Sequence, residues 1–192
     1  MSVLPAQTIR KLCVDPETAM IWPFSERALA NGMTGGLGPC TYDFRIKQKL
    51  VLLPWWKLPC LLVLRAFDWT WNRFRRTPMW LYAHYHCSFA LASTVERVNI
   101  PHDICGTVMD KSSWARQGLA VQNTKFDPGF HGYPTIELSN HGLSTLVIEA
   151  GQPICQFKFE RLEEPTDLPY AGRYLGQGDE PTPYRPAKDK WG

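Results

Sequence analysis

The sequence lacks the ligand pattern of a zinc enzyme. It has no C-x-x-C motif and no H-x-E followed by P-C-x-x-C, and neither Cys40 nor Cys60 is followed by a second cysteine three residues later. Five histidines are present without a recognisable ligand cluster, and we interpret His84 and His86 as ordinary strand residues. Because zinc deaminases of nucleobases require such ligands, we expect no zinc cofactor.

Signals for secretion and membrane insertion are also missing. The N-terminal segment MSVLPAQTIRKL contains no long apolar run, and the six cysteines are not densely spaced. The apolar stretch 50–64 is interrupted by Pro54, Lys57 and Pro59 and is shorter than the ~18–20 residues of a membrane span. We therefore expect a cytoplasmic protein with reduced, mostly buried thiols and no membrane partner.

Neither sign of charge dominates the chain. It has 21 Lys and Arg residues against 18 Asp and Glu residues, which gives a formal net charge of +3. Such a balance does not indicate a protein that coats DNA. An anionic small molecule fits as well as a nucleic acid, because a few local cations suffice to bind a triphosphate.

What is present predicts one domain built mainly of strands. A chain of 192 residues with 44% hydrophobic residues can bury a substantial core. We expect a short helix at 5–13, a loop at 32–39, where four glycines occur, and a strand at 42–46. Further strand-like runs follow, separated by turn residues about every 8–12 positions: CSFALAS, ERVNI, GTVM, TIELS, STLVIE and ICQFKF. This rhythm is typical of an all-β barrel or sandwich.

Two stretches differ from this pattern. Residues 50–84 combine several tryptophans with Arg73, Arg75 and Arg76, which favours a core and subunit-interface role over stacking on bases. After residue 164 the chain is rich in proline and glycine and cannot build a core. The sequence thus predicts a domain at 1–164 and a tail at 165–192 that is either disordered or folded over another part.

One group of polar residues lies in a predicted short helix that begins near Ser112 and would end at Gly118. Hydroxyl and N–H groups of Lys111, Ser112 and Ser113 could bind an anion at its start, although serines there are most often caps. Arg116 lies one turn further on and could hold a carboxylate, a phosphate or a water. Its alternative is a surface arginine without a role.

A second group combines a turn with a strand. Asp127-Pro128-Gly129 reads as a turn whose carboxylate could accept a hydrogen bond from a sugar hydroxyl, and Phe130 behind it could support a flat ring. Strand alternation places Glu137 on the same face as Thr135. A desolvated glutamate has a raised pKa and can shuttle protons, whereas a nearby Arg116 would lower that pKa. The alternative is a glutamate that faces solvent.

The order of these motifs resembles the dCTP deaminase family, the non-zinc deaminase branch of the dUTPase superfamily. Lys111–Leu119 is similar to R-S-S-L-A-R-L-G-L, and Asp127–Leu138 resembles D-P-G-F-x-G-x-x-T-L-E-L. Cys40–Ile46, Gly151–Phe159 and Tyr170–Gln177 are similar to the family's S-x-D-x-R-L, G-x-x-I-x-Q-x-x-F and Y-x-G-K-Y-x-x-Q motifs.

The resemblance implies a mainly β protein, a β-clip or jelly-roll-like distorted barrel of the dUTPase type with a short N-terminal helix. It implies a homotrimer with sites between subunits, a deoxynucleotide substrate with Mg²⁺ on its triphosphate, and no nucleic-acid partner. Glu137 matches the catalytic glutamate, and Ser112 and Arg116 match its partners. The other matched positions bind the nucleotide: Lys111, Ser113, Asn123 (or Thr124) near the base, Asp127 at the sugar, Gln156, Tyr170, Arg173 and Gln177.

Three departures from the family pattern keep alternatives open. Lys111 replaces an arginine, Trp114 replaces a leucine, and the stretch 120–126 is shorter than the one that contacts the base in the family. The leading hypothesis is metal-free hydrolytic deamination of dCTP to dUTP and ammonia. The alternatives are a dUTPase-type or bifunctional enzyme that gives dUMP and pyrophosphate, and a non-enzymatic nucleotide sensor.

Overall fold

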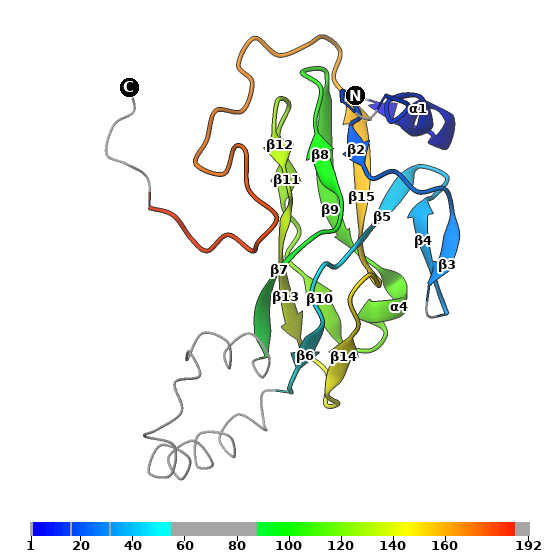
Figure 1. The fold of residues 1–192 in the computed structure, drawn as a ribbon, viewed down its shortest axis with the longest axis vertical. Helices are drawn as coiled ribbons and strands as arrows, with labels where there is room; N and C mark the ends of the chain where they lie inside the picture. The colour runs from blue at the N-terminus through cyan, green and yellow to red at the C-terminus, as the bar shows by residue number, and fades with distance from the viewer. Residues whose placement is uncertain (1, 16, 31, 55–87, 187–192) are drawn as a thin grey trace.

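The structure is a computed structural model that describes residues 2–15, 17–30, 32–54 and 88–186 (Figure 1). It is mainly β, as predicted. The N-terminal elements are β1 (Ser2–Val3), α1 (Ala6–Lys11), β2 (Ile21–Trp22), β3 (Ala28–Ala30), β4 (Met33–Leu37), β5 (Thr41–Arg45) and β6 (Leu50–Leu52). The later ones are β7 (Phe89–Ser93), β8 (Arg97–Asn99), β9 (Ile104–Asp110), α4 (Ser112–Ala115), β10 (Leu119–Val121), β11 (Lys125–Phe126), β12 (His131–Gly132), β13 (Thr135–Asn140), β14 (Leu146–Ile148) and β15 (Pro153–Arg161).

The longest strand, β15, organises the largest sheet. It pairs antiparallel with β9 on one side and β5 on the other, in the order β11-β9-β15-β5-β4-β3, with β1 added to β15. Along β15, Phe157 and Phe159 are fully buried, and the Phe157 ring stacks on Phe44 of β5 with 3.9 Å between ring centroids. This alternation of buried aromatic residues creates the core that supports the functional site.

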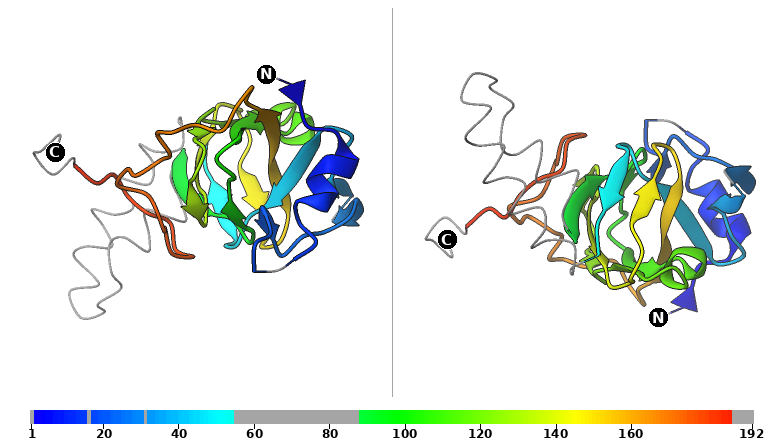
Figure 2. Two further views of the ribbon diagram at one scale, coloured as in Figure 1. Left: turned by 90° about the horizontal axis from the view of Figure 1, so that it is seen from above. Right: turned by 90° about the horizontal axis from the view of Figure 1, so that it is seen from below.

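Three smaller sheets complete the body, in the orders β10-β13-β7, β12-β8-β2 and β14-β6. In β13, Ile136 and Leu138 are buried while Thr135 and Glu137 are half-buried on the other face, which confirms the predicted alternation. Within the described residues the sheets do not close into a barrel. Figure 2 shows α1 and the C-terminal segment on opposite sides of this body.

The predicted loop at 32–39 is wrong, because β4 covers most of it. Glycine serves there to allow close approach rather than to prevent strand formation. A Cβ on Gly35 would lie 2.7 Å from Cγ of Pro153, and one on Gly36, whose φ is +74°, would lie 2.4 Å from the carbonyl oxygen of Glu26. The strand therefore requires residues without side chains at these two positions.

Other local predictions are confirmed. The helix at 5–13 is α1, the strand at 42–46 is β5, and the strand-like runs after residue 87 correspond to β7, β8, β9, β13, β14 and β15. Among the described cysteines, Cys13, Cys105 and Cys155 are buried, Cys40 is exposed, and all four are free thiols. The prediction for the Trp/Arg-rich segment falls almost entirely on residues 55–87, and so do His84 and His86; these residues lie outside the described part.

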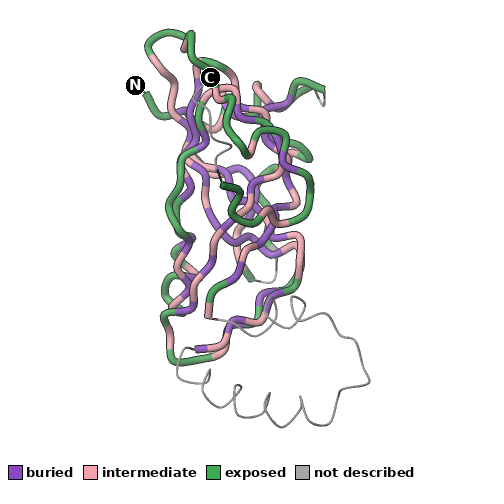
Figure 3. The backbone as a smooth tube through the Cα atoms, turned by 90° about the vertical axis from the view of Figure 1, so that its left-hand side faces the viewer, coloured by how far each residue is buried: buried purple, intermediate pink, exposed green. Residues whose placement is uncertain are grey.

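The segment after β15 has no regular secondary structure up to residue 186. Figure 3 shows this segment as a mostly exposed or half-buried path along a body whose buried residues follow the strands. Tyr170 and Tyr174 pack against the hydrophobic core from outside. No helix among the described residues is long and apolar enough to cross a membrane.

Candidate active site

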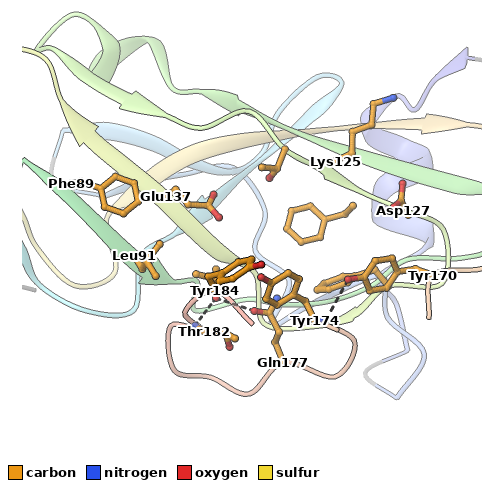
Figure 4. Close-up of a pocket in the computed structure, with 14 residues that line it drawn as sticks. Phe89, Leu91, Lys125, Asp127, Glu137, Tyr170, Tyr174, Gln177, Thr182 and Tyr184 are labelled. Atoms are coloured by element: carbon orange, nitrogen blue, oxygen red, sulfur yellow. Dashed lines mark hydrogen bonds between the residues drawn. The ribbon is translucent and has the colours of Figure 1, made fainter. Parts of the chain in front are cut away.

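A cavity of about 460 Å³ opens between β13, β7, β11 and the C-terminal segment (Figure 4). Figure 4 shows Glu137 and Tyr184 near one end of it, and Lys125, Asp127 and Tyr170 near the other. Fourteen side chains line the cavity: Phe89, Leu91, Thr124, Lys125, Phe126, Asp127, Phe130, Thr135, Glu137, Tyr170, Tyr174, Gln177, Thr182 and Tyr184. The cavity has the size of a small-molecule site, and six of its lining side chains are aromatic, one is aliphatic and seven are polar or charged.

Glu137 is the half-buried acid of this cavity. It stands on β13 opposite Leu91 of β7, and its Oε2 atom is buried with no hydrogen-bond partner among the described residues. Burial raises the pKa of the Glu137 carboxyl, and a backbone hydrogen bond opposes this in part. From the sequence, desolvation could raise this pKa and a nearby Arg116 could lower it. In the structure desolvation has the larger effect, so the pKa is raised. A desolvated carboxyl with a free oxygen facing a cavity can exchange protons with a bound ligand.

The other end of the cavity suits a sugar. The Phe130 N–H donates to the carbonyl oxygen of Asp127 at 3.1 Å, which confirms the predicted turn. The Asp127 carboxylate is on an exposed residue at the rim, while Phe130 is buried beneath and contacts Phe126 and Tyr170 edge to face. This pairing of an exposed acceptor with an aromatic floor fits the polar edge and apolar face of a sugar ring.

The C-terminal segment is fastened across the cavity. The Tyr170 N–H donates to the carbonyl oxygen of Pro128 at 2.8 Å, and Gln177 forms a β-bridge with Gly132. The Thr135 hydroxyl donates to Oε1 of Gln177 at 3.1 Å and accepts from the Thr182 N–H at 3.0 Å. Thr135 thus joins the strand of Glu137 to two points of the segment.

The polar residues at the turn of α4, which run from Lys111 to Arg116, lie outside the cavity lining. The Arg116 N–H donates to the carbonyl oxygen of Ser112 at 3.1 Å, so the two lie one turn apart as predicted, but both are exposed and neither lines the cavity. The N-terminal residue of the turn, Lys111, makes no side-chain cap. Its buried ammonium pairs with Oδ2 of Asp43 at 2.7 Å. Trp114 anchors the turn by donating from its indole N–H to the carbonyl oxygen of Pro153 at 2.8 Å.

The structure thus divides the predicted site residues into two sets. Four of them line the cavity together: Asp127, Glu137, Tyr170 and Gln177. Seven do not: Lys111, Ser112, Ser113, Arg116, Asn123, Gln156 and Arg173. Arg173 is next to a cavity residue in the C-terminal segment, and Gln156 lies on β15 between Asp43 and Met109.

Sequence reasoning missed several cavity residues. Lys125 is two positions before Asp127, so strand alternation could have placed both on one face. Phe89 and Leu91 alternate along β7 and pair with Ser139 and Glu137 of β13, so they lie on the same face of the sheet as Glu137 and could have been found in the same way. Tyr174, Thr182 and Tyr184 come from the C-terminal segment, where no periodicity exists to guide a prediction.

Among the described residues, no group of three or more His, Cys, Asp or Glu side chains is arranged to hold a metal ion. The carboxylates of Asp127 and Glu137 face different ends of the cavity (Figure 4). This donor set fits a cation that arrives with ligand phosphates rather than one held by side chains alone.

The arrangement of strands is shared with a solved structure. The crystal structure of a 2'-deoxycytidine 5'-triphosphate deaminase from Agrobacterium tumefaciens matches with a TM-score of 0.50 at 18% sequence identity, over 83% of this chain and 48% of that one. The architecture is the mainly β, dUTPase-type fold that the resemblance implied.

Sequence similarity then gives the family. Residues 3–162 match the model of the family described as dCTP deaminase-like. The dCTP deaminase of Granulibacter bethesdensis is 33% identical over 182 residues, which cover 92% of this chain and 96% of that protein. The dCTP deaminase of Novosphingobium aromaticivorans is 32% identical over 183 residues, with 92% and 96% covered. The match to the dCTP deaminase of Thermomicrobium roseum is 41% identical but spans about half of each chain, 53% and 54%. The chain belongs to the dCTP deaminase-like family.

Proposed function

We propose that the protein is a hydrolase that deaminates a deoxycytidine nucleotide, dCTP first of all, to the deoxyuridine nucleotide and ammonia. The observation that carries this proposal is Glu137: a carboxyl with a raised pKa and an unpartnered buried oxygen, facing a cavity of nucleoside size. Family membership supports it, because the relatives are named dCTP deaminase.

In the proposed reaction Glu137 carries the protons. Its carboxylate takes a proton from a water molecule, and the resulting hydroxide attacks C4 of the cytosine ring. The protonated Glu137 gives that proton to N3, then takes the proton of the C4 hydroxyl and passes it to the amine, so that the C4–N bond breaks, C4=O forms, ammonia leaves and the carboxylate is restored. A raised pKa suits this cycle, because a carboxylate that binds a proton more tightly is a stronger base toward water. Such acid–base help typically contributes about 10²–10⁴ in rate.

The water and the phosphates need groups that one chain's cavity does not provide. Of the residues that line it, Lys125 is the one with a positive charge, and Asp127 and Glu137 are the two with a carboxyl group. Ser112 and Arg116 are exposed on the turn of α4, away from the cavity. We propose that a second copy of the chain supplies them, so that Ser112 and Arg116 hold the attacking water within a homotrimer.

The remaining nucleotide contacts follow from the same assembly. Asp127 would bind the sugar, and Tyr170 and Gln177 would bind from the segment that covers the cavity. Arg173 lies at its edge, whereas Ser113, Asn123 and Gln156 would contribute from a neighbouring chain. Lys111 would act through its backbone and by holding the turn in place, because Asp43 already neutralises its ammonium.

The substrate class implies two further features. Mg²⁺ would be bound through the triphosphate oxygens and, when present, would offset part of their charge. Residues 165–192 would form a lid over the domain at 1–164. A deoxynucleoside triphosphate substrate fits a cytoplasmic enzyme of pyrimidine nucleotide metabolism.

A second candidate is a bifunctional enzyme that releases dUMP and pyrophosphate. One relative that supports it, a protein of Methanosphaera stadtmanae named dCTP deaminase, dUMP-forming, is 38% identical over 96 residues, covering 46% of this chain and 49% of that protein. In that reaction the Asp127 carboxylate would orient a water toward the α-phosphorus.

The two functions are separated by product analysis. The full chain is incubated with dCTP and, separately, with dUTP in the presence of Mg²⁺, and ammonia and pyrophosphate are measured independently. Ammonia without pyrophosphate supports the deaminase. Ammonia together with pyrophosphate supports the bifunctional enzyme, and pyrophosphate from dUTP alone supports a dUTPase. Release of neither product would overturn the proposed function in favour of a nucleotide sensor.

A further inference from the structure

The C-terminal segment extends beyond the last motif that resembles the family and doubles back on itself. The Arg185 N–H donates to the Tyr174 hydroxyl at 3.3 Å. Arg173 and Arg185 each donate a guanidinium N–H to the backbone carbonyl oxygen of the other. Residues 173–185 therefore form a closed loop, which the Thr182 N–H fastens to Thr135 at 3.0 Å.

This loop brings Tyr184 to the cavity. Thr182 is bound to Thr135, which lies two residues before Glu137 on the same face of β13, so the loop reaches the end of the cavity where Glu137 stands. Tyr184 lines that end, and Figure 4 shows its ring next to Glu137. The guanidinium of Arg173 packs on the Tyr184 ring, with its carbon 5.7 Å from the ring centroid.

Among the described residues, the packing of the Arg173 guanidinium is the ring contact of Tyr184, and most of the side chain stays open to solvent. Its relative exposure is 78%, so it adds little to the core of the free chain, and the contacts of the loop are otherwise made by its neighbours. A large, exposed aromatic ring beside a cavity gains burial when a flat ligand covers it.

We propose that Tyr184 is a substrate-binding residue that stacks on the pyrimidine base of the nucleotide. The inference rests on the proposed function. The base, rather than the sugar or the phosphates, fits this end, because the apolar Phe89 and Leu91 and the ring of Tyr184 surround Glu137 there and no cationic side chain of the described residues lines it, whereas Lys125 and Asp127 lie at the other end. Stacking is indifferent to the amino group of cytosine, so Tyr184 would hold the substrate base and the deaminated base alike.

The test compares a nucleotide with its base-free counterpart. Binding of dCTP and of 2-deoxyribose 5-triphosphate, both with Mg²⁺, is measured by calorimetry on the full chain in a Glu137→Gln background, which prevents turnover. Tyr184→Ala should weaken dCTP binding by about tenfold, the value of one aromatic stack, and leave the base-free triphosphate unchanged. Tyr184→Phe should behave like the background protein. Leu168→Ala, which truncates an exposed residue of the same segment outside the cavity lining, is the matched control.

Each outcome has a distinct meaning. Equal weakening of both probes by Tyr184→Ala would overturn the proposal, because the ring would then act through the loop or the phosphates. Unchanged dCTP affinity would overturn it as well, and so would an equal loss in Tyr184→Phe, which would assign the effect to the hydroxyl. Failure of the proposed function is recognised separately, since the chain with Glu137 intact would then release no ammonia from dCTP whatever residue 184 is.

Discussion

The cavity around Glu137 and the turn of α4 carry the two halves of one predicted catalytic group, yet their surroundings are opposite. Glu137 is desolvated, and its pKa is raised. Ser112 and Arg116 are exposed, on a turn that is rigidly anchored from behind by Lys111 and Trp114. Burial within the chain raises the pKa of Glu137, whereas Ser112 and Arg116 lie at the surface of the same chain. This difference is the reason for proposing that a second chain completes the site.

The largest effect on deamination is expected from substitution of Glu137. Glu137→Gln should abolish deamination, with a loss of at least about 10²–10⁴-fold, because the amide cannot take up the proton of water. Nucleotide affinity should stay within a few-fold, since Glu137 acts in proton transfer. Ammonia release and a nucleotide titration measure the two quantities. Substantial residual turnover would mean that another group is the base.

The covering segment should have the next largest effect. Truncation after Glu164 removes the contacts of Tyr170 and Gln177 with the cavity, and charge-assisted bonds from Arg173 to phosphate would be lost with them. We expect a folded protein with strongly weakened nucleotide binding and little activity. A thermal melt is recorded beside the titration. Unchanged nucleotide affinity would mean that the segment after Glu164 does not bind the nucleotide. Loss of the cooperative melt would mean that the segment is needed for folding.

A mixing experiment sharpens the comparison of the two halves directly. Glu137→Gln and Arg116→Ala are each expected to be inactive alone. If a site takes Glu137 from one chain and Arg116 from another, subunit exchange between the two variants should restore part of the parent activity, because some sites then receive both intact groups. A trimer by light scattering at micromolar concentration is expected throughout. A monomer, or no recovery after verified exchange, would contradict a shared site.

The smallest effect concerns stability. A carboxyl whose pKa is raised on folding stabilises the folded state fully below its unfolded pKa, which is near the ordinary value of 4.5, and this contribution is lost as the pH rises through the folded pKa. Glu137→Gln should therefore match the parent in unfolding midpoint at acidic pH and exceed it by a growing margin toward neutral pH. Urea unfolding of both proteins over a pH series measures this margin. Glu163→Gln, at an exposed position, is the control, and an equal margin there would contradict the assignment.

Local features were predictable from the sequence where a period or a turn signal exists. Alternation placed Glu137 on the open face of β13, and the Asp127 turn and the start of α4 followed from their residue types. Gly35 and Gly36 misled the prediction, because the close approach of Pro153 and Glu26 that makes glycine necessary in β4 is a long-range contact. The separation of Arg116 from the cavity and the return of Tyr184 to it are also long-range, and motif order carries no information on either.

The hydroxyl of Thr135 has a consequence for how a catalytic cycle would end. It binds Gln177 and Thr182 at once, two residues from the proton-carrying carboxyl, so lifting the segment to free the product would also admit solvent to Glu137. Rewetting lowers the affinity of a carboxyl for its proton. Product departure would then also stabilise the carboxylate form of Glu137, which is the form that accepts a proton from the next water molecule.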